Sequence, residues 1–270
     1  MIQIKDLNFA YLRQQALFSG LSMHLKAESI TGLLGKNGAG KTSLLKLITG
    51  LLHPKSGEIS VLDHKPGKRE VSLLTDIFLV PEEFIFPAIS INAYRKAYAQ
   101  FYPGFDHAML DSILIEFELH AKSNLQRLSH GQVKKFLIAF ALSTKCRLLV
   151  LDEPTNGLDI PSKSLFRKIL AGSLDENQLV IISTHQVKDV ENLIDKVIIL
   201  DNGKVIFQQT IAEISQKVCF ISDTSDDLEG AIYSEAVPGG YRLIMPNGHA
   251  ETEVDFELLF NAITKGKKIE

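Results

Sequence analysis

One short motif constrains the fold of this chain more than any other feature. Residues 35–42 read GKNGAGKT, which fits the spacing G-x-x-x-x-G-K-[ST]. The apolar run 29–34 before it is typical of a buried strand, and 42–49 after it predicts a helix closed by Gly50. A glycine-rich turn between a strand and a helix gathers backbone N–H groups around the positive end of the helix. The motif therefore predicts a phosphate-binding loop in an α/β fold.

The residue types within this loop suit a nucleotide with several phosphates. Lys41 supplies a mobile positive charge, and the Thr42 hydroxyl is the expected protein ligand of Mg²⁺. Backbone N–H groups provide most of the remaining phosphate contacts. The expected phosphate-binding residues are Gly35, Asn37, Gly38, Ala39, Gly40, Lys41, Thr42 and Ser43.

A second apolar run ends on two adjacent carboxylates. Residues 148–151 predict a buried strand, and Asp152 and Glu153 follow at its carboxyl end. In a sheet of this type that end lies beside the phosphate-binding loop. We therefore expect Asp152 to hold Mg²⁺ through a water and Glu153 to polarise the attacking water. Without Lys41 in the same chain, such a pair would more simply be a solvated turn.

Composition and charge exclude several classes of function. The net charge of the 270-residue chain is −3, and its basic residues are interspersed with acids, which argues against nucleic acid as a partner. The longest apolar run, Phe136–Leu142, is far shorter than the roughly 20 residues that span a bilayer. The amino terminus has no secretory signal pattern. Cys146 and Cys219 are too few for a disulfide framework and fit a reducing cytoplasm.

The rest of the chain divides by pattern into an insertion and an appended segment. Residues 84–126 are rich in helix formers and aromatics, which predicts a helical insertion, and Asp201–Gly203 predicts a two-strand hairpin. After Gln208, short strands are expected at 218–222 and 241–245. Thr252 with Asp255 predicts a capping box for a helix whose apolar face is Phe256, Leu259, Phe260 and Ile263.

LSHGQ at 128–132 resembles the signature motif of ATP-binding cassette (ABC) ATPases, and the resemblance extends over about residues 2–207. Further matches follow the order of the family: Tyr11 at the adenine-stacking aromatic, Glu82 at the Q-loop glutamine, Asn156–Asp159 at the D-loop and His185 at the switch histidine that contacts the γ-phosphate. The resemblance implies a P-loop NTPase (RecA-like) α/β core with a mixed sheet and an N-terminal antiparallel β portion. It also implies an ATPase domain over 1–207 with a helical subdomain at about 84–145, followed by a small C-terminal α+β extension over 208–270.

The signature implies a site shared between two chains. Residues 132–143 predict a helix with Ser129 and Gly131 at its positive end, where an anion is attracted. In the family this anion is the γ-phosphate of ATP held by the opposite subunit, contacted by the signature residues. The expected cofactors are ATP and Mg²⁺, and the expected assembly is a homodimer, with a heterodimer as the alternative. The implied residues are Glu153, His185 and Lys41 for catalysis, Tyr11, Glu82, Ser129, Gly131 and Gln132 for nucleotide binding, and Thr42, Asp152 and Glu82 for the metal.

Two positions depart from the family pattern. Glu82 replaces the usual glutamine with a charged ligand, which should still coordinate Mg²⁺ but alter the rate or the metal preference. His130 replaces the first glycine of LSGGQ and puts a side chain near the dimer seam. This combination resembles the subset of ABC ATPases that serve exporter-type, ABC-2-like permeases.

The implied function is the energy-coupling subunit of a transporter whose permease is a separate polypeptide. The chain is then expected in the cytoplasm, peripheral on the inner face of the cell membrane, with the permease docking near Glu82 and 84–126. One alternative is a soluble ABC ATPase, for example in cofactor assembly. Another is a P-loop nucleotide kinase, which would need neither LSHGQ nor His185. The C-terminal extension is expected to support dimer or permease contacts, and Lys134 and Lys135 to form a solvated helix face.

Overall fold

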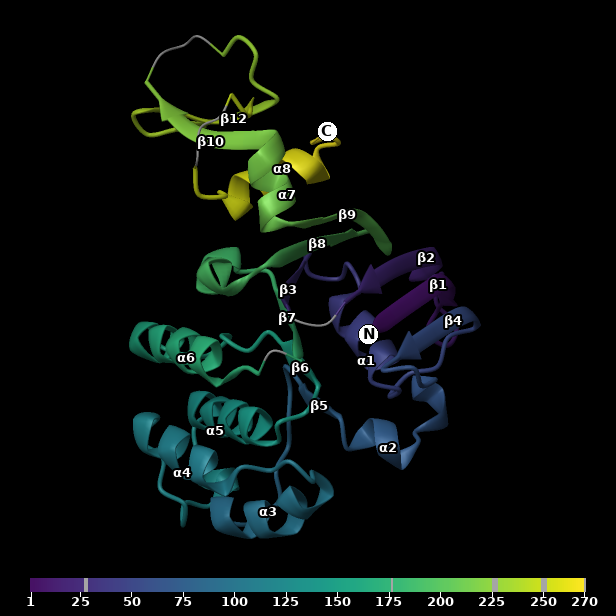
Figure 1. Cartoon of the computed structure of the whole chain (residues 1–270), viewed down its shortest axis with the longest axis vertical. Coiled ribbons are helices and arrows are strands. Elements are labelled where there is room, and N and C mark those ends of the chain that lie inside the picture. Colours follow the sequence, from purple (N-terminus) through teal and green to yellow (C-terminus); the bar gives the residue numbers. More distant parts are fainter. Residues whose placement is uncertain (27–28, 176, 225–227, 249–251, 270) are drawn as a thin grey trace.

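A mixed sheet of six strands forms the middle of the structure (Figure 1). This computed structural model describes residues 1–26, 29–175, 177–224, 228–248 and 252–269. Strands β5-β6-β7-β3-β8 are parallel neighbours in that order, and β9 pairs antiparallel with β8. The strands and helices are β1 (Ile2–Phe9), β2 (Phe18–Leu25), β3 (Ser29–Leu34), α1 (Lys41–Ile48), β4 (Ser56–Val61), α2 (Val71–Leu74), β5 (Ile77–Val80), α3 (Ile91–Tyr98), α4 (His107–Glu116), α5 (His130–Ser143), β6 (Leu148–Asp152), α6 (Ile160–Ser173), β7 (Leu179–Thr184), β8 (Lys196–Asp201), β9 (Lys204–Thr210), α7 (Ile211–Lys217), β10 (Val218–Asp223), β11 (Tyr233–Val237), β12 (Gly240–Pro246) and α8 (Phe256–Thr264).

Both faces of the central sheet are covered, which explains why its strands read as continuous apolar runs. Successive side chains of a strand point to opposite faces. On β6, Leu149 and Leu151 join the hydrophobic cluster that includes α5 and α6, whereas Leu148 and Val150 join the cluster that includes α1. The expected mixed α/β core is therefore confirmed.

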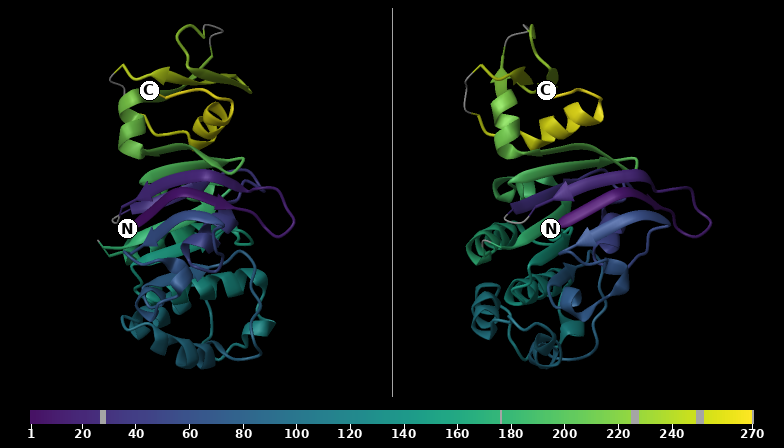
Figure 2. Two further views of the ribbon diagram at one scale, coloured as in Figure 1. Left: turned by 90° about the vertical axis from the view of Figure 1, so that its right-hand side faces the viewer. Right: turned by 45° about the vertical axis from the view of Figure 1, so that its right-hand side comes forward.

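A smaller antiparallel sheet in the order β2-β1-β4 lies beside α1 (Figure 2). Its β2 was not among the predicted strands, although Leu21, Met23 and Leu25 are buried and alternate with exposed residues. The apolar side chains of this sheet share a cluster with Leu44 and Leu45 of α1. The antiparallel portion and the central sheet therefore enclose the helix that begins at the phosphate-binding loop.

Helices α3, α4 and α5 form the part of the molecule beyond β5 and β6 (Figure 1). An aromatic cluster around Phe140 of α5, which includes Phe78, Tyr102 and Phe105, fills the space between these elements. The predicted solvated face of α5 is wrong at Lys134, whose relative exposure is 0%. No helix in the described ranges combines the length and the apolar character that crossing a bilayer requires.

The C-terminal residues form a three-stranded sheet, β10-β12-β11, together with α7 and α8. Neither α7 nor β11 was predicted. The expected capping box at Thr252 is wrong: Asp255 is the N-cap of α8 and accepts from the backbone N–H of Leu258, while the Thr252 hydroxyl accepts from the backbone N–H of Phe220. Threonine and aspartate can both cap a helix, but the Thr252 hydroxyl is already hydrogen-bonded to β10, so Asp255 caps α8.

Candidate nucleotide site

The predicted phosphate-binding loop connects β3 to α1, as its sequence pattern required. Gly40 is the N-cap of α1 with φ 105°, and a Cβ at this position would lie 2.8 Å from the Phe18 ring. Only glycine combines that backbone conformation with the close contact. A cavity of about 780 Å³ opens over the loop and is lined by Tyr11, Gln14, Gln15, Ala16, Leu17, Lys36, Asn37, Gly38, Gly40, Lys41, Thr42, Ser43, Glu82, Glu153, Asn156 and His185.

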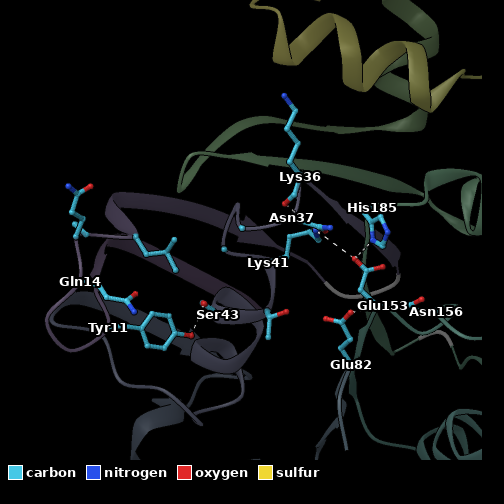
Figure 3. A pocket seen from close by; sticks show the side chains of 16 residues that line it. Tyr11, Gln14, Lys36, Asn37, Lys41, Ser43, Glu82, Glu153, Asn156 and His185 are labelled. Atoms are coloured by element: carbon cyan, nitrogen blue, oxygen red, sulfur yellow. Dashed lines mark hydrogen bonds and ion pairs between the residues drawn. The ribbon is translucent and has the colours of Figure 1, made fainter. Parts of the chain in front are cut away.

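Lys41 lies at the floor of this cleft with a relative exposure of 7%. Its Nζ donates to the carbonyl oxygen of Gly35 at 2.7 Å and to that of Lys36 at 3.4 Å. The same Nζ is 3.7 Å from Glu153 Oε1 (Figure 3). The loop therefore holds its own cation against a carboxylate that comes from another strand of the sheet.

Glu153 follows β6 in a backbone conformation that is uncommon for a side-chain-bearing residue, with φ 46°. Its backbone N–H donates to the carbonyl of Ser183 at 3.1 Å. Its Oε1 lies 2.9 Å from Nδ1 of His185, just beyond the end of β7. Strained backbone of this kind persists where surrounding contacts enforce it, and it concentrates at functional sites. The positive φ thus aims the carboxylate toward both Lys41 and His185.

Asp152 is buried, with a relative exposure of 2%, and does not itself line the cleft. Its Oδ1 accepts a hydrogen bond from the hydroxyl of Ser183 on β7. Ser183 was not a predicted site residue, because a serine at the end of an apolar strand carries no distinctive signal of its own. The pairing of β6 with β7, which sets Asp152 beside Ser183, creates the contact.

The opposite wall of the cleft carries an aromatic ring. Tyr11 has a relative exposure of 37%, and its edge-to-face contact with Phe9 has a centroid distance of 5.0 Å. Its hydroxyl lies 2.8 Å from Oγ of Ser43, at the start of α1. The ring therefore lies at the cleft wall beside the phosphate-binding loop (Figure 3), where a flat apolar base could stack on it.

Glu82 enters the cleft from the segment after β5, and Asn156 enters from the loop after β6 (Figure 3). Nδ2 of Asn156 lies 3.4 Å from Oε1 of Glu82. The structure therefore brings the Q-loop and D-loop positions together with Lys41, Glu153 and His185 in one place.

The signature residues lie elsewhere on the same chain. Ser129 is the N-cap of α5 and forms a capping box with Gln132: the Ser129 hydroxyl accepts from the Gln132 backbone N–H at 3.2 Å, and the Ser129 backbone N–H donates to Gln132 Oε1 at 2.9 Å. A Cβ on Gly131 would lie 2.7 Å from the carbonyl oxygen of Gly157. Ser129, Gly131 and Gln132 do not line the cleft that contains Lys41. The exposed start of α5 therefore lies outside the lining of the chain's own candidate nucleotide site.

Comparisons with known proteins agree with this geometry. Residues 18–156 match the family model described as ABC transporter. The chain is 31% identical over 212 residues to the SkfA peptide export ATP-binding protein SkfE of Bacillus subtilis (strain 168), covering 76% of this chain and 87% of that protein. This chain belongs to the ABC transporter family. It is also 34% identical over 236 residues to the energy-coupling factor transporter ATP-binding protein EcfA2 of Ligilactobacillus salivarius (strain UCC118), covering 79% of this chain and 80% of that protein.

A solved structure of an ATP-binding subunit of an ABC transporter superposes on the chain with a TM-score of 0.72 at 25% identity, covering 79% of this chain and 91% of that one. The expected P-loop NTPase fold is confirmed. As a member of the ABC family the chain is an ATP-binding transporter subunit and an ATPase. Family membership also removes the nucleotide kinase from consideration.

The donor set of this ABC site suits Mg²⁺ when a nucleotide is present. Thr42, Asp152 and Glu82 offer one hydroxyl and two carboxylates, and Mg²⁺ prefers such oxygen ligands together with substrate phosphates and water. In the described part of the chain no three His, Cys, Asp or Glu side chains form a cluster that could hold a metal by themselves. Any Mg²⁺ here would therefore depend on phosphate oxygens for part of its coordination shell.

Proposed function

We propose that this chain hydrolyses MgATP at the cleft around Lys41 and couples this reaction to a separate membrane permease. The observation that carries the proposal is the contact of one carboxylate, Glu153, with both Lys41 at 3.7 Å and His185 at 2.9 Å. These side chains come from α1, from the end of β6 and from the end of β7. A cation, a candidate base and a histidine meet beside the glycine-rich loop that precedes α1, which suits phosphoryl transfer to water.

Each side chain then has a defined role. Lys41 neutralises charge on the terminal phosphates, and Glu153 orients and polarises the attacking water. His185 contacts the γ-phosphate through its ring, which Glu153 holds in place by the bond to Nδ1. Tyr11 stacks on the adenine. Thr42, Asp152 and Glu82 would hold Mg²⁺, which supplies charge neutralisation when it is bound.

The second proposal is a nucleotide shared by two copies of this chain. The N-terminus of α5 has an exposed Ser129 and a helix macrodipole that favours anions. Ser129, Gly131 and Gln132 do not line their own chain's cleft, which supports a γ-phosphate supplied by a partner copy. Loss of that phosphate on hydrolysis removes the contact that favours the closed dimer, so the population shifts toward the open form.

The coupled permease would dock on the helical part of the molecule, near Glu82 and α3. The relatives with printed transport roles support a transporter rather than a free-standing ATPase. We further propose that the chain is peripheral on the inner face of the cell membrane through this permease. Glu82 and His130 favour an exporter-type, ABC-2-like permease. Purification of the tagged chain from membranes in mild detergent should recover a multi-span protein at a fixed ratio, and recovery of the chain alone would argue for the soluble alternative.

Glu153→Gln tests both the catalytic role and the shared nucleotide. The substitution keeps the shape of the side chain but removes the base, so turnover should fall about 10²- to 10⁴-fold while ATP binding persists. Since ATP then remains intact, the variant should sediment as a dimer with ATP and as a monomer without it. Steady-state phosphate release and analytical ultracentrifugation measure the two effects.

Glu83→Gln is the matched control, because Glu83 is exposed and does not line the cleft. It should retain wild-type turnover. Near-wild-type turnover of Glu153→Gln would overturn the assignment of the base. Monomers alone under every nucleotide condition would overturn the shared site.

A further inference from the structure

Helix α5, which begins within the signature motif LSHGQ, contains a buried lysine that does not line the nucleotide cleft. Lys134 lies in the second turn of α5, and its side chain is fully buried. Removing an ammonium group from water costs several kcal/mol, so lysine is almost never fully buried without compensating partners. Within the part of the chain that the structure describes, Lys134 forms no ion pair. Its direct contacts are therefore with neutral groups.

Those partners are two backbone carbonyls and one aromatic ring. Nζ of Lys134 donates to the carbonyl oxygen of Pro81 at 3.0 Å and to that of Glu82 at 3.2 Å. The same Nζ lies 5.3 Å from the centroid of the Phe84 ring. An ammonium has three N–H donors and no acceptor, so two hydrogen bonds and a cation–π contact largely replace its hydration.

These two hydrogen bonds hold the peptide units on both sides of Glu82. The Pro81 carbonyl belongs to the peptide unit before the Glu82 Cα, and the Glu82 carbonyl belongs to the unit after it. Two fixed peptide planes determine φ and ψ of the residue between them. Lys134 therefore restrains the direction in which the Glu82 side chain leaves the backbone.

A second contact joins the same helix to the same segment. The His130 ring stacks on the Phe84 ring with a centroid distance of 4.9 Å and an interplanar angle of 16°. Positions 130 and 134 lie four residues apart and thus on one face of α5. Burial lowers the pKa of Lys134, and the carboxylates of Asp152, Glu82 and Glu153 act against this shift. The Lys134 ammonium is therefore close enough to these three carboxylates to interact with their negative charges.

We propose that Lys134 is a positioning residue that fixes the Glu82 backbone and so determines where the Glu82 carboxylate stands in the MgATP site. The inference rests on the proposed role of Glu82 as an oxygen ligand near the metal. Lys134 would then link two proposed nucleotide sites. It connects α5, whose N-terminus would contact the partner's nucleotide, to Glu82, which would contact the chain's own MgATP. A purely structural lysine would stabilise α5 without affecting how the site responds to Mg²⁺.

Lys134→Met tests the link, since methionine fills a similar space without donors or charge. We expect about a 10- to 100-fold loss of turnover, the usual effect of removing a group that orients a metal ligand, together with a higher Mg²⁺ concentration at half-maximal rate. ATP affinity measured in EDTA should stay at the wild-type value, because the phosphate-binding loop is untouched. Lys135→Met is the matched control on the same helix and should leave the turnover and the Mg²⁺ dependence unchanged.

Combination with Glu82→Gln separates positioning from stability. If Lys134 acts through Glu82, the double variant loses less activity than the product of the two single losses. Multiplicative losses would overturn the inference, as would Mg²⁺ dependence of Lys134→Met equal to that of Lys135→Met. In either case, hydrolysis by the wild-type chain would leave the proposed function standing.

Failure of the wild-type chain to hydrolyse ATP would instead remove the proposed function and this inference with it. Lys134→Gln decides the matter if the methionine variant does not fold, because the amide keeps donors but lacks the charge and the reach of lysine. A folded glutamine variant with raised half-saturating Mg²⁺ supports the inference. Wild-type kinetics in that variant would overturn it.

Discussion

At the scale of single residues, the site depends on one carboxylate that serves several contacts. Glu153 has a positive φ, and its carboxylate meets Lys41 and His185, which lie on other elements. Its backbone N–H donates to Ser183, so the conformation is held from the main chain as well as from the side chain. Because the contacts converge on one residue, substitutions around it should separate binding from turnover.

Lys41→Ala removes the mobile cation of the phosphate-binding loop. Charged hydrogen bonds contribute about 1.5–3 kcal/mol each, so ATP affinity should fall about 10- to 100-fold. The variant should therefore no longer bind ATP tightly. Titration with a fluorescent ATP analogue measures the change. Lys46→Ala, at the far end of α1, is the control and should bind normally. An unchanged affinity in Lys41→Ala would contradict the role of the loop.

At the scale of elements, α5 joins three functions in one helix. Its N-terminus presents Ser129, its second turn holds Lys134 against the segment after β5, and its apolar face contributes Phe136 and Phe140 to the aromatic cluster. Gly131 lies against the carbonyl of Gly157, so the signature and the D-loop position are in direct contact. A change at the start of α5 therefore affects helix stability and the proposed shared site together.

Ser129→Ala should cost about 1 kcal/mol of stability through loss of the N-cap and should also reduce turnover, because the γ-phosphate of the partner's ATP loses a hydroxyl. Ser90→Ala is a matched control: Ser90 caps α3 by accepting from the Ala93 backbone N–H at 3.1 Å. It should lose similar stability yet keep its turnover. Urea unfolding and phosphate release measure both quantities. Equal turnover in the two variants would speak against a signature role for Ser129.

At the scale of the whole molecule, the C-terminal residues share their core with the ATPase part. Phe207 and Ile214 belong to one hydrophobic cluster with Phe256 and Leu259 of α8 and with the α5 and α6 side of the central sheet. Lys188, just after the switch position, also pairs with Glu257 at 3.1 Å. That pair is exposed and contributes only about 0–1 kcal/mol, so packing rather than charge holds the C-terminal part in place.

Phe256→Ala tests whether the C-terminal part unfolds with the rest. The side chain is 4% exposed, and removing a buried phenylalanine costs about 3–5 kcal/mol. With a shared core, the entire chain should unfold in one weakened transition, followed by circular dichroism in urea. Phe101→Ala, at a ring that is 57% exposed, should cost far less. A separate early transition that preserves ATP binding would show an independent C-terminal domain, as the boundary at 208 predicts.

The sequence alone determined the features that depend on residue type and local order. The loop at 35–40 between a strand and a helix, the strand that ends at Asp152, and the hairpin at 201–203 are all present as predicted, because glycine conformations, apolar runs and turn residues act over a few neighbouring positions. The family resemblance then identified Tyr11, Glu82 and His185, and the structure places all three in one cleft with Lys41.

Tertiary structure decided whatever depends on which distant element covers a residue. The sequence pattern predicts a surface position for Lys134, yet the residue is buried. Its Nζ donates to the carbonyl of Pro81, which is 53 positions away in the sequence. Ser183 becomes a partner of Asp152 only through the pairing of β7 with β6. Asp255 rather than Thr252 caps α8, because the Thr252 hydroxyl already accepts a hydrogen bond from the backbone N–H of Phe220 in β10. Packing between segments that are far apart in the sequence determines which residues are buried and which hydrogen-bond partners they find. A local sequence pattern therefore cannot predict either.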